Sequence, residues 1–273
     1  MPKLAALSDR GVVRITGEDR GVFLQGLVSN DVEAVAPGQA VWAALLTPQG
    51  KWLADFFVLT DGEALLLDAE RAQVPMLVQR LSRYRLRMKV ALAPDESMQV
   101  YVGWDGAPDA GGVIAPDPRL DGFAWRILTT SALSVNATAA DWDRHRLAHG
   151  IPDGSRDLES DKTVLLEAGF DELNGVSWTK GCYMGQELTA RTRYRGLLKR
   201  RVVPVEIDGK LPAPGTPVFR DGAEIGTMRS GLDHTGLAVL RLDSLDANLT
   251  CGEARLTPRI PTWMRLPESS KAG

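Results

Sequence analysis

Cysteine is scarce in this sequence, because the 273 residues include only Cys182 and Cys251. Two thiols do not make a disulfide framework, which favours a reducing compartment. They also cannot supply the four thiolates that a four-iron cluster usually takes from its protein. One copy of the chain therefore cannot hold such a cluster alone by the usual route.

The sequence has no apolar run near the roughly 18 residues that a membrane-spanning helix needs. Its first ten residues contain Lys3, Asp9 and Arg10, a pattern too short and too soon charged for a signal peptide. The formal net charge of −3 disfavours the whole chain as a binder of polyanions. We therefore expect a cytoplasmic protein with no membrane partner and no direct nucleic-acid binding.

Histidine is also rare. Of the three histidines, His145 and His149 are four residues apart on a predicted helix. Such a pair could share a metal ion, but it more often belongs to an ordinary helix face. The sequence contains no P-loop, no G-x-G-x-x-G loop and no H-E-x-x-H helix. We therefore predict no metal site.

Short strands and helices alternate along the first 200 residues. Period-two patterns predict strands, and apolar residues at helical spacing predict helices. A Pro-Gln-Gly turn at residues 48–50 joins two strands into a hairpin. Residues 103–121, rich in Gly, Pro and Asp, are predicted to form a loop. The predicted strands are 12–15, 41–46, 52–59, 64–67, 86–92, 98–102 and 123–128, and the predicted helices start near 17 and cover 74–81, 141–149 and 185–194.

The pattern changes after Arg201. Short apolar runs are then separated by Gly, Pro and Asp, at residues 202–207, 216–220, 224–228, 237–242 and 253–256. Several short strands at this spacing predict a small β-barrel. The chain is thus predicted to be α+β, with one region at 1–200 (a possible subdivision near 95–120), a β-barrel at 201–266 and a disordered tail at 267–273.

Residues 180–191, KGCYMGQELTAR, are the most informative segment. Cys182 would lie just before a helix N-terminus and near Lys180 and Arg191, and both surroundings favour a thiolate. Glu187 and Arg191 are spaced to pair on one helix face. The alternative is an ordinary loop in which the cysteine is a small buried hydrophobe. The residue types alone leave both interpretations open.

This segment resembles the K-G-C-Y-x-G-Q-E signature of the YgfZ family and of the related mitochondrial iron–sulfur assembly factor. Further segments agree in the same order. They are FLQG at 23–26, SND at 29–31, LTPQGK at 46–51, YRLR at 84–87, GIP at 150–152, NGVS at 174–177 and YRG at 194–196. The resemblance covers nearly the whole chain.

The resemblance implies the fold of the glycine cleavage T-protein, in which two α+β subdomains surround a central channel and a small β-barrel follows. It implies that tetrahydrofolate or a derivative binds in that channel. It also implies an accessory protein that supports iron–sulfur cluster assembly or repair in client enzymes, including tRNA-modifying ones. Its partners would be iron–sulfur assembly proteins or these client enzymes.

Candidate site residues follow from the same resemblance. The LEAG segment at 166–169 resembles the T-protein segment whose glutamate binds the pterin, so Glu167 is the candidate anchor. A carboxylate can accept two adjacent pterin N–H groups. Further cofactor-binding candidates are Lys51, Tyr84, Arg85 and Arg191. Cys182 is the candidate reactive thiol or transient ligand, in a signature loop of Lys180, Gly181, Cys182, Tyr183, Gly185, Gln186 and Glu187.

A folate-dependent aminomethyl transferase is the main alternative function. The T-protein carries an aspartate pair after a Gly-Gly hairpin, and here Ala54 and Asp55 stand at those two positions. Lys51 replaces the second glycine of that hairpin. Asp55 remains a catalytic candidate, but the two departures favour an assembly factor over an active transferase. A nucleic-acid module using the basic stretch at 191–201 is a third, less favoured alternative.

Overall fold

The computed structural model describes residues 1–245 and 248–266. The predicted tail at 267–273 lies outside the described residues. The chain folds into two compact units that interleave along the sequence. The first unit consists of Met1–Trp142 and Leu173–Gln186, and the second of Asp143–Glu172 and Glu187–Gly273. The domain boundaries predicted from the sequence follow chain order instead and stay a prediction.

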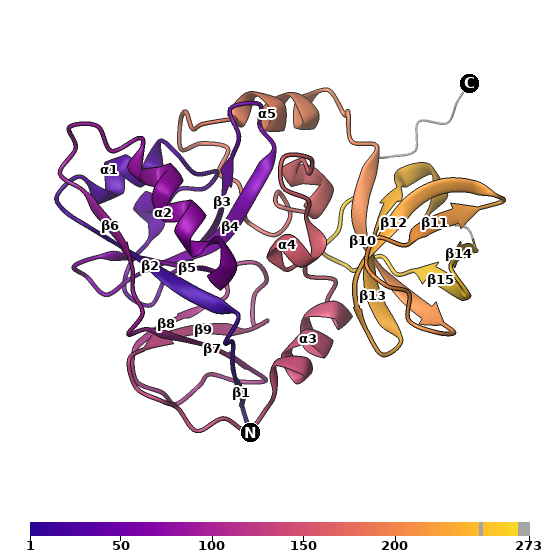
Figure 1. Ribbon diagram of the computed structural model, residues 1–273, viewed down its shortest axis with the longest axis horizontal. Coiled ribbons are helices and arrows are strands. Elements are labelled where there is room, and N and C mark those ends of the chain that lie inside the picture. Colours follow the sequence, from indigo (N-terminus) through magenta and orange to yellow (C-terminus); the bar gives the residue numbers. More distant parts are fainter. Residues whose placement is uncertain (246–247, 267–273) are drawn as a thin grey trace. The chain divides into compact units, whose positions relative to one another are not determined.

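Antiparallel strands make up most of the first unit (Figure 1). They are β1 (Lys3–Ala6), β2 (Arg10–Thr16), β3 (Val41–Leu46), β4 (Trp52–Thr60), β5 (Leu65–Glu70), β6 (Ala91–Pro94), β7 (Gln99–Trp104), β8 (Val113–Pro116) and β9 (Trp125–Thr129). One sheet has the order β3-β4-β5-β2-β6, and a second has the order β1-β7-β9-β8. The predicted hairpin at residues 47–50 is confirmed, since β3 and β4 pair across it.

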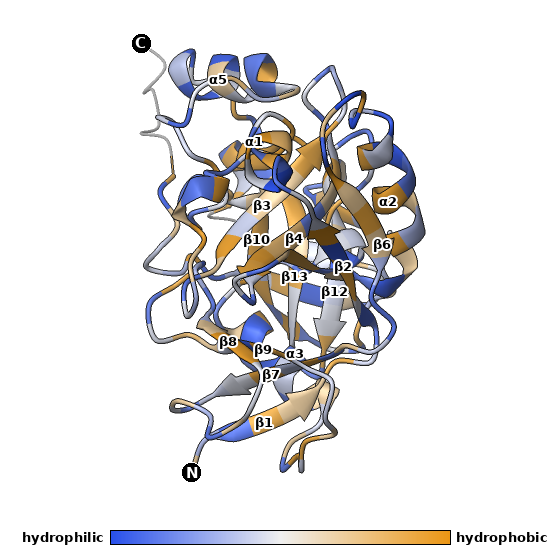
Figure 2. Ribbon diagram, turned by 90° about the vertical axis from the view of Figure 1, so that its left-hand side faces the viewer, coloured by the Kyte–Doolittle hydropathy of each residue, from blue (hydrophilic) through white to orange (hydrophobic). Residues whose placement is uncertain are grey.

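The core of the first unit lies against the five-stranded sheet. Strands β3 and β4 are buried along almost their whole length, and Figure 2 shows both in the hydrophobic colour. Helix α1 (Arg20–Gln25) buries Phe23, and helix α2 (Val74–Ser82) buries Leu77 and Leu81. These side chains belong to one apolar cluster. Burying each such side chain contributes about 1.5–3 kcal/mol.

A buried carboxylate joins the two sheets of this unit. Asp68 on β5 accepts a hydrogen bond from Arg10 Nε at 2.5 Å and one from Arg126 Nε, on β9, at 2.8 Å. Asp68 is fully buried and both arginines are nearly so. Buried charges persist only where they are paired. This pairing therefore fixes the contact between the sheets.

The second unit contains a closed barrel, which confirms the predicted C-terminal β-barrel. Its strands are β10 (Arg200–Asp208), β11 (Pro217–Arg220), β12 (Ala223–Leu232), β13 (Thr235–Arg241), β14 (Leu249–Cys251) and β15 (Ala254–Pro258), and their order is β10-β13-β12-β11-β14-β15. The barrel interior is apolar, with Val203, Met228 and Leu240 fully buried. The α+β class predicted from the sequence is confirmed.

Helices and turns complete the chain. Helix α3 (Ala139–Ala148) begins in the first unit and ends in the second. The remaining helices are α4 (Gly154–Asp157) and α5 (Gln186–Tyr194), and the 3-10 turns are η1 (Val32–Ala34), η2 (Arg71–Gln73), η3 (Leu165–Ala168) and η4 (Leu242–Ser244). The helices predicted near 17 and at 74–81, 141–149 and 185–194 are thus present, with shifted ends.

The strand predicted over residues 86–92 is wrong for most of its length. Only its end belongs to β6, which starts at Ala91. Leu86 has a φ of 46°, in the left-handed region, which no extended strand contains. The N–H of Met88 donates to the carbonyl of Arg85 at 2.9 Å and closes a turn. The alternating apolar residues therefore follow turns, not the pleat of a sheet.

Three strands were missed. Strands β1 and β8 are four residues long and lie at the two edges of their sheet, and β14 has three residues. Strand β8 lies inside the segment 103–121 that was predicted to be a loop. Such short strands depend on pairing with distant partners, because their own patterns are too short to indicate a period.

Candidate functional site

The signature loop is tied to the first unit by the side chain of Lys180. Its ammonium donates to the carbonyl oxygens of Val28 at 2.7 Å and Asn30 at 2.6 Å. It also lies 5.4 Å from the centroid of the Tyr183 ring, which is buried. Hydrogen bonds from a charged donor are stronger than those between neutral groups. Lys180 therefore fixes the start of the loop.

Ser29 and Asn30 make a second set of contacts, with the segment that leads into the loop. The Ser29 hydroxyl donates to the carbonyl of Gly175 at 2.7 Å, and the Ser29 carbonyl accepts from the N–H of Ser177 at 3.0 Å. The Asn30 side-chain amide donates to the carbonyl of Asn174 at 2.7 Å. Two segments far apart in the sequence are thus joined in the fold.

A third contact involves the β3–β4 hairpin. Gly185 has a φ of 81°, and a Cβ at this position would lie 2.5 Å from the Thr47 carbonyl oxygen and 3.0 Å from the Cα of Gly50. Only glycine lets two backbones approach so closely. The N–H of Met184 also donates to the Gly26 carbonyl at 3.2 Å. The structure therefore brings together three segments that the sequence analysis could only match in order.

Cys182 lies at the exposed tip of this anchored loop. The backbone before it is open as well, because a Cβ at Gly181 would meet no atom within 4 Å. Cys251 is fully buried inside the barrel. Of the two thiols in the chain, Cys182 is the one that a partner can reach. The alternative in which Cys182 fills space in a core does not hold.

The residues after Cys182 start helix α5, whose first residue is Gln186. The Gln186 side chain turns back and accepts the N–H of Tyr183 at 3.1 Å. Glu187 and Arg191 are exposed on this helix. In the described part of the chain they form no ion pair with each other, so the predicted pairing does not contribute to the helix.

Burial changes the titration of Lys180. Loss of water around the ammonium lowers its pKa to about 8, and the nearby carboxylates of Asp31 and Glu33 oppose this effect. A lysine with so low a pKa is partly neutral near physiological pH. The amine that anchors the loop is therefore itself sensitive to mildly alkaline pH.

Asp55 is held inside the first unit by two tryptophans. Its Oδ2 accepts the indole N–H of Trp42 at 2.9 Å, and its Oδ1 accepts that of Trp52 at 3.1 Å. The residue is 6% exposed. Both carboxylate oxygens thus have neutral donors, an arrangement that orients the indoles. A chemical role for Asp55 stays a prediction.

Glu167 lies in the second unit, at the end of η3. Its Oε2 accepts the backbone N–H of Val164 at 3.2 Å, which caps this turn. Its Oε1 lies 3.4 Å from Arg200 Nη2, a long contact that leaves the oxygen able to accept a better donor. The Glu167 side chain is 14% exposed. The position is therefore partly structural and partly open to a ligand.

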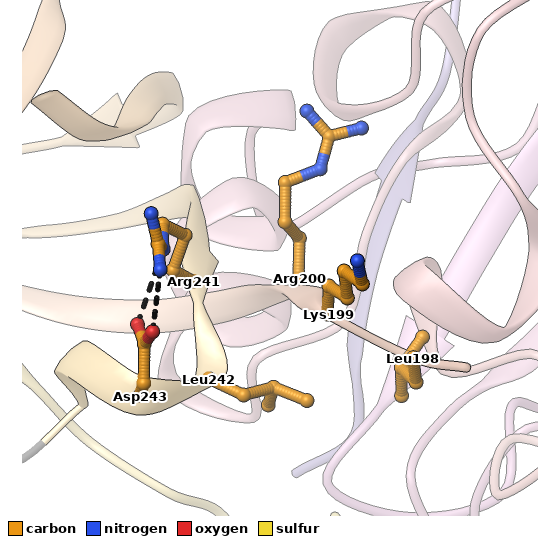
Figure 3. Close-up of a pocket in the computed structure, with 6 residues that line it drawn as sticks. All are labelled: Leu198, Lys199, Arg200, Arg241, Leu242 and Asp243. Atoms are coloured by element: carbon orange, nitrogen blue, oxygen red, sulfur yellow. Dashed lines mark hydrogen bonds and ion pairs between the residues drawn. The ribbon is translucent and has the colours of Figure 1, made fainter. Parts of the chain in front are cut away.

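Arg200 also lines a cavity of about 620 Å³ at the start of β10 (Figure 3). Figure 3 shows Arg241 on the opposite side, paired with Asp243, where Nη2 and Oδ2 are 2.6 Å apart. Among the residues that the structure describes, Lys199 has no carboxylate partner on this cavity wall. The cavity therefore has a net positive lining, which suits an anionic group.

The remaining cofactor-binding candidates are divided between the units. Lys51, Tyr84 and Arg85 belong to the first unit, and Arg191 belongs to the second with Glu167. Tyr84 is 41% exposed and precedes the left-handed Leu86. Their predicted contacts with folate stay predictions.

Sequence reasoning missed the side chains that anchor and line these sites. Ser29 and Asn30 were noted only as part of a matching segment, and no local pattern indicates that they contact residues 174–177. Arg200 was counted only in a basic stretch. The run of buried residues that follows it on β10 shows no alternation that would mark it as an outward-facing cation. Contacts between distant segments leave no periodic signal.

The histidine pair gives no indication of a metal site. The rings of His145 and His149 are 4.5 Å apart, and Nδ1 of His149 is 2.8 Å from the carbonyl oxygen of His145. Over residues 1–245 and 248–266, no three His, Cys, Asp or Glu side chains are grouped as metal ligands. No helix within these ranges is long and apolar enough to cross a membrane.

Comparisons with known proteins agree on one family. Residues 199–266 match the model of the CAF17 C-terminal β-barrel domain. The chain is 31% identical to the mitochondrial iron–sulfur cluster assembly factor IBA57 of Mus musculus over 300 residues, covering 94% of this chain and 84% of the relative. It is 30% identical to the protein of the same name from Homo sapiens, with the same coverage of both chains.

Among solved structures, the chain resembles the glycine cleavage system aminomethyltransferase T from Bartonella henselae. The TM-score is 0.73 over 96% of this chain and 85% of that chain, at 13% sequence identity. Identity this low shows the fold alone. The T-protein-like α+β fold with a C-terminal barrel is thereby confirmed.

The close approach of Gly185 to the hairpin predicts a specific cost for a side chain there. Gly185→Ala would strain a left-handed residue by about 1–2 kcal/mol and add a clash worth about 1–3 kcal/mol. Gly181→Ala is the matched control, because its φ is 92° but no atom lies within 4 Å. Chemical denaturation should show the larger loss for Gly185→Ala, with faster amide exchange in the loop. Equal losses would mean that the contact with the hairpin is unimportant.

Proposed function

Since this chain belongs to the IBA57/CAF17/YgfZ family, we propose that it is an iron–sulfur cluster assembly factor that supports cluster assembly or repair in client enzymes. The proposed clients include tRNA-modifying enzymes, and the proposed partners are iron–sulfur assembly proteins or the clients themselves. We further propose that it works in the cytoplasm, although its curated relatives are named as mitochondrial proteins.

The observation that carries the proposal is the exposed thiol of Cys182 on an anchored loop. A thiolate is both a nucleophile and a ligand for iron. The buried Cys251 cannot join it at a cluster, so further ligands would come from another molecule. The cluster is then a cargo shared with a partner, in agreement with the single reachable cysteine of the chain.

We also propose that the chain binds tetrahydrofolate or a derivative, as the T-protein-like fold suggests. The residues present fit such a ligand. Glu167 offers Oε1 to pterin N–H groups, and Lys199 and Arg200 give the neighbouring cavity a positive wall. Its volume of about 620 Å³ falls in the range common for ligand pockets. When bound, tetrahydrofolate would supply a reduced pterin and a carrier for one-carbon units.

Aminomethyl transfer is less well supported. A general base must lie within hydrogen-bond reach of the proton that it accepts from the substrate. Asp55 is 6% exposed, and its two oxygens already hold the indole N–H groups of Trp42 and Trp52, so a substrate would have to share these oxygens with both indoles. Ala54 replaces the first aspartate of the transferase pattern. These features favour an assembly factor that keeps the transferase fold.

Complementation tests the assembly role. Cells that lack their own member of this family should regain the activity of iron–sulfur enzymes, and their modified tRNA nucleosides, when they express this chain. The amounts of the client enzymes should be the same with and without this chain, because we expect the cells to lack bound clusters and not the enzymes themselves. Failure to restore any client, with the chain present and folded, would contradict the assignment.

A tetrahydrofolate titration, followed by calorimetry or tryptophan fluorescence, tests the folate role. Wild-type protein should bind saturably, and Glu167→Gln should weaken binding by about tenfold or more, because the amide replaces the charged acceptor. Glu206→Gln is the control, since Glu206 pairs with Arg259 on the exposed barrel surface. Unchanged affinity in Glu167→Gln would remove this residue from the pterin site.

A further inference from the structure

The second unit has a second cavity, which is lined by Arg201 of β10. It has a volume of about 250 Å³, far more than one water molecule needs. Leu166, Leu198 and Leu266 form apolar parts of its wall, and Arg201 and Arg265 form charged parts. The preceding residue on the strand, Arg200, lines the larger cavity described above. No charged residue lines both cavities.

Arg201 is a buried cation with an incomplete set of partners. Its side chain is 2% exposed, and its Nη1 donates to Glu172 Oε1 at 2.8 Å. Its Nε and Nη2 are also buried and have no hydrogen-bond partner. A buried donor without an acceptor destabilises the folded state, and more strongly when the group is charged. Because Arg201 is also one of the residues that line the cavity, a ligand bound there is the nearest source of the missing acceptor.

The geometry of the guanidinium specifies what that acceptor would be. Nε and Nη2 lie side by side on one edge of the planar group and present parallel N–H bonds. Carboxylates and phosphates accept such a pair through two oxygens at once. The other edge is already used, because Nη1 faces Glu172. One oxyanion would therefore give an acceptor to each of the two nitrogens that lack one.

The charges around the cavity are consistent with an anion. Glu172 is shared, since its Oε1 also accepts the backbone N–H of Arg265 at 3.3 Å. Asp171 lies 3.5 Å from Arg193. The guanidinium of Arg265 has no carboxylate partner within the described residues, so three cations face two carboxylates in the wall. The lining thus has room for one negative charge.

We infer that this cavity binds a small oxyanion, a carboxylate or a phosphate group, through the Nε–Nη2 edge of Arg201 with Arg265 as the second cation. The leucine side chains would contact an apolar part of the ligand. This site goes beyond the proposed folate and cluster roles, and it could be occupied in the absence of either.

Sodium acetate and sodium phosphate are the probes, added to the full-length protein at constant ionic strength set with chloride. The readout is the Nε–H resonance of Arg201 in ¹⁵N-arginine-labelled protein, assigned by its loss in Arg201→Lys. We expect a saturable shift with at least one probe. The probe that binds more tightly identifies the ligand class as carboxylate or phosphate.

Variants test the forked contact. Arg201→Lys keeps the charge but loses the paired donors, so calorimetric affinity should fall about tenfold or more. Arg265→Gln should also weaken binding. Arg255→Gln is the matched control, an exposed arginine of β15 outside the cavity lining, and should leave affinity unchanged.

Two outcomes would overturn the inference. One is the absence of any saturable shift at tens of millimolar of either anion, which would mean that water supplies the acceptors. The other is equal affinity in the wild type and Arg265→Gln. If Arg201→Lys fails to fold, the calorimetric affinities of the wild type and of the exposed Arg265→Gln variant still decide. Because the assay contains no folate and no iron–sulfur enzyme, its failure is separate from failure of the proposed function.

Discussion

The ammonium of Lys180, held by the carbonyl oxygens of Val28 and Asn30, is the interaction on which the functional loop depends. Without it, a loop that begins at Ser177 and contains two glycines would have many conformations to choose from. The anchor works with two other constraints, the Ser29 and Asn30 hydrogen bonds and the glycine contact at the hairpin. Together they hold the backbone on both sides of Cys182 while the thiol itself stays exposed.

This arrangement is consistent with the proposal that a chain with two cysteines takes part in iron–sulfur chemistry. The thiol of Cys182 is exposed on an anchored loop, and the thiol of Cys251 is buried in the barrel. A cluster needs several ligands, so a displayed single thiol suits transient or shared ligation better than storage. Burial lowers the pKa of Lys180 to about 8, so between about pH 8 and 10.5 a lysine exposed to water binds its proton more readily than the buried one. The docked loop therefore gains stability relative to an undocked loop as pH rises through this range.

The sequence predicted the elements whose patterns are local and strong. The β3–β4 hairpin followed from alternating apolar runs around a Pro-Gln-Gly turn, and helix α2 from its apolar face. The segment at 86–92 failed because its alternation coincides with a left-handed Leu86 and a chain of turns. Strands β1, β8 and β14 were missed because pairing with distant strands, and not their own composition, makes them strands.

The candidate site divides in the same way. The Cys182 loop could be singled out from the sequence, because its motif is contiguous. The sequence could not predict that residues 23–31 and 46–51 contact this loop. These contacts join segments that are more than a hundred residues apart in the sequence. The sequence also could not predict that Nε and Nη2 of Arg201 are buried without acceptors, because burial and hydrogen-bond partners are properties of the fold.

The most direct test of this account compares the two cysteines in cells that lack their own family member. Iron–sulfur enzyme activity should be lost with Cys182→Ala and retained with Cys251→Ala, provided that both variants accumulate to wild-type levels. Such a result would assign the function to the displayed thiol. Full activity with Cys182→Ala would contradict the account, because the anchored loop would then serve some purpose other than presenting a thiol.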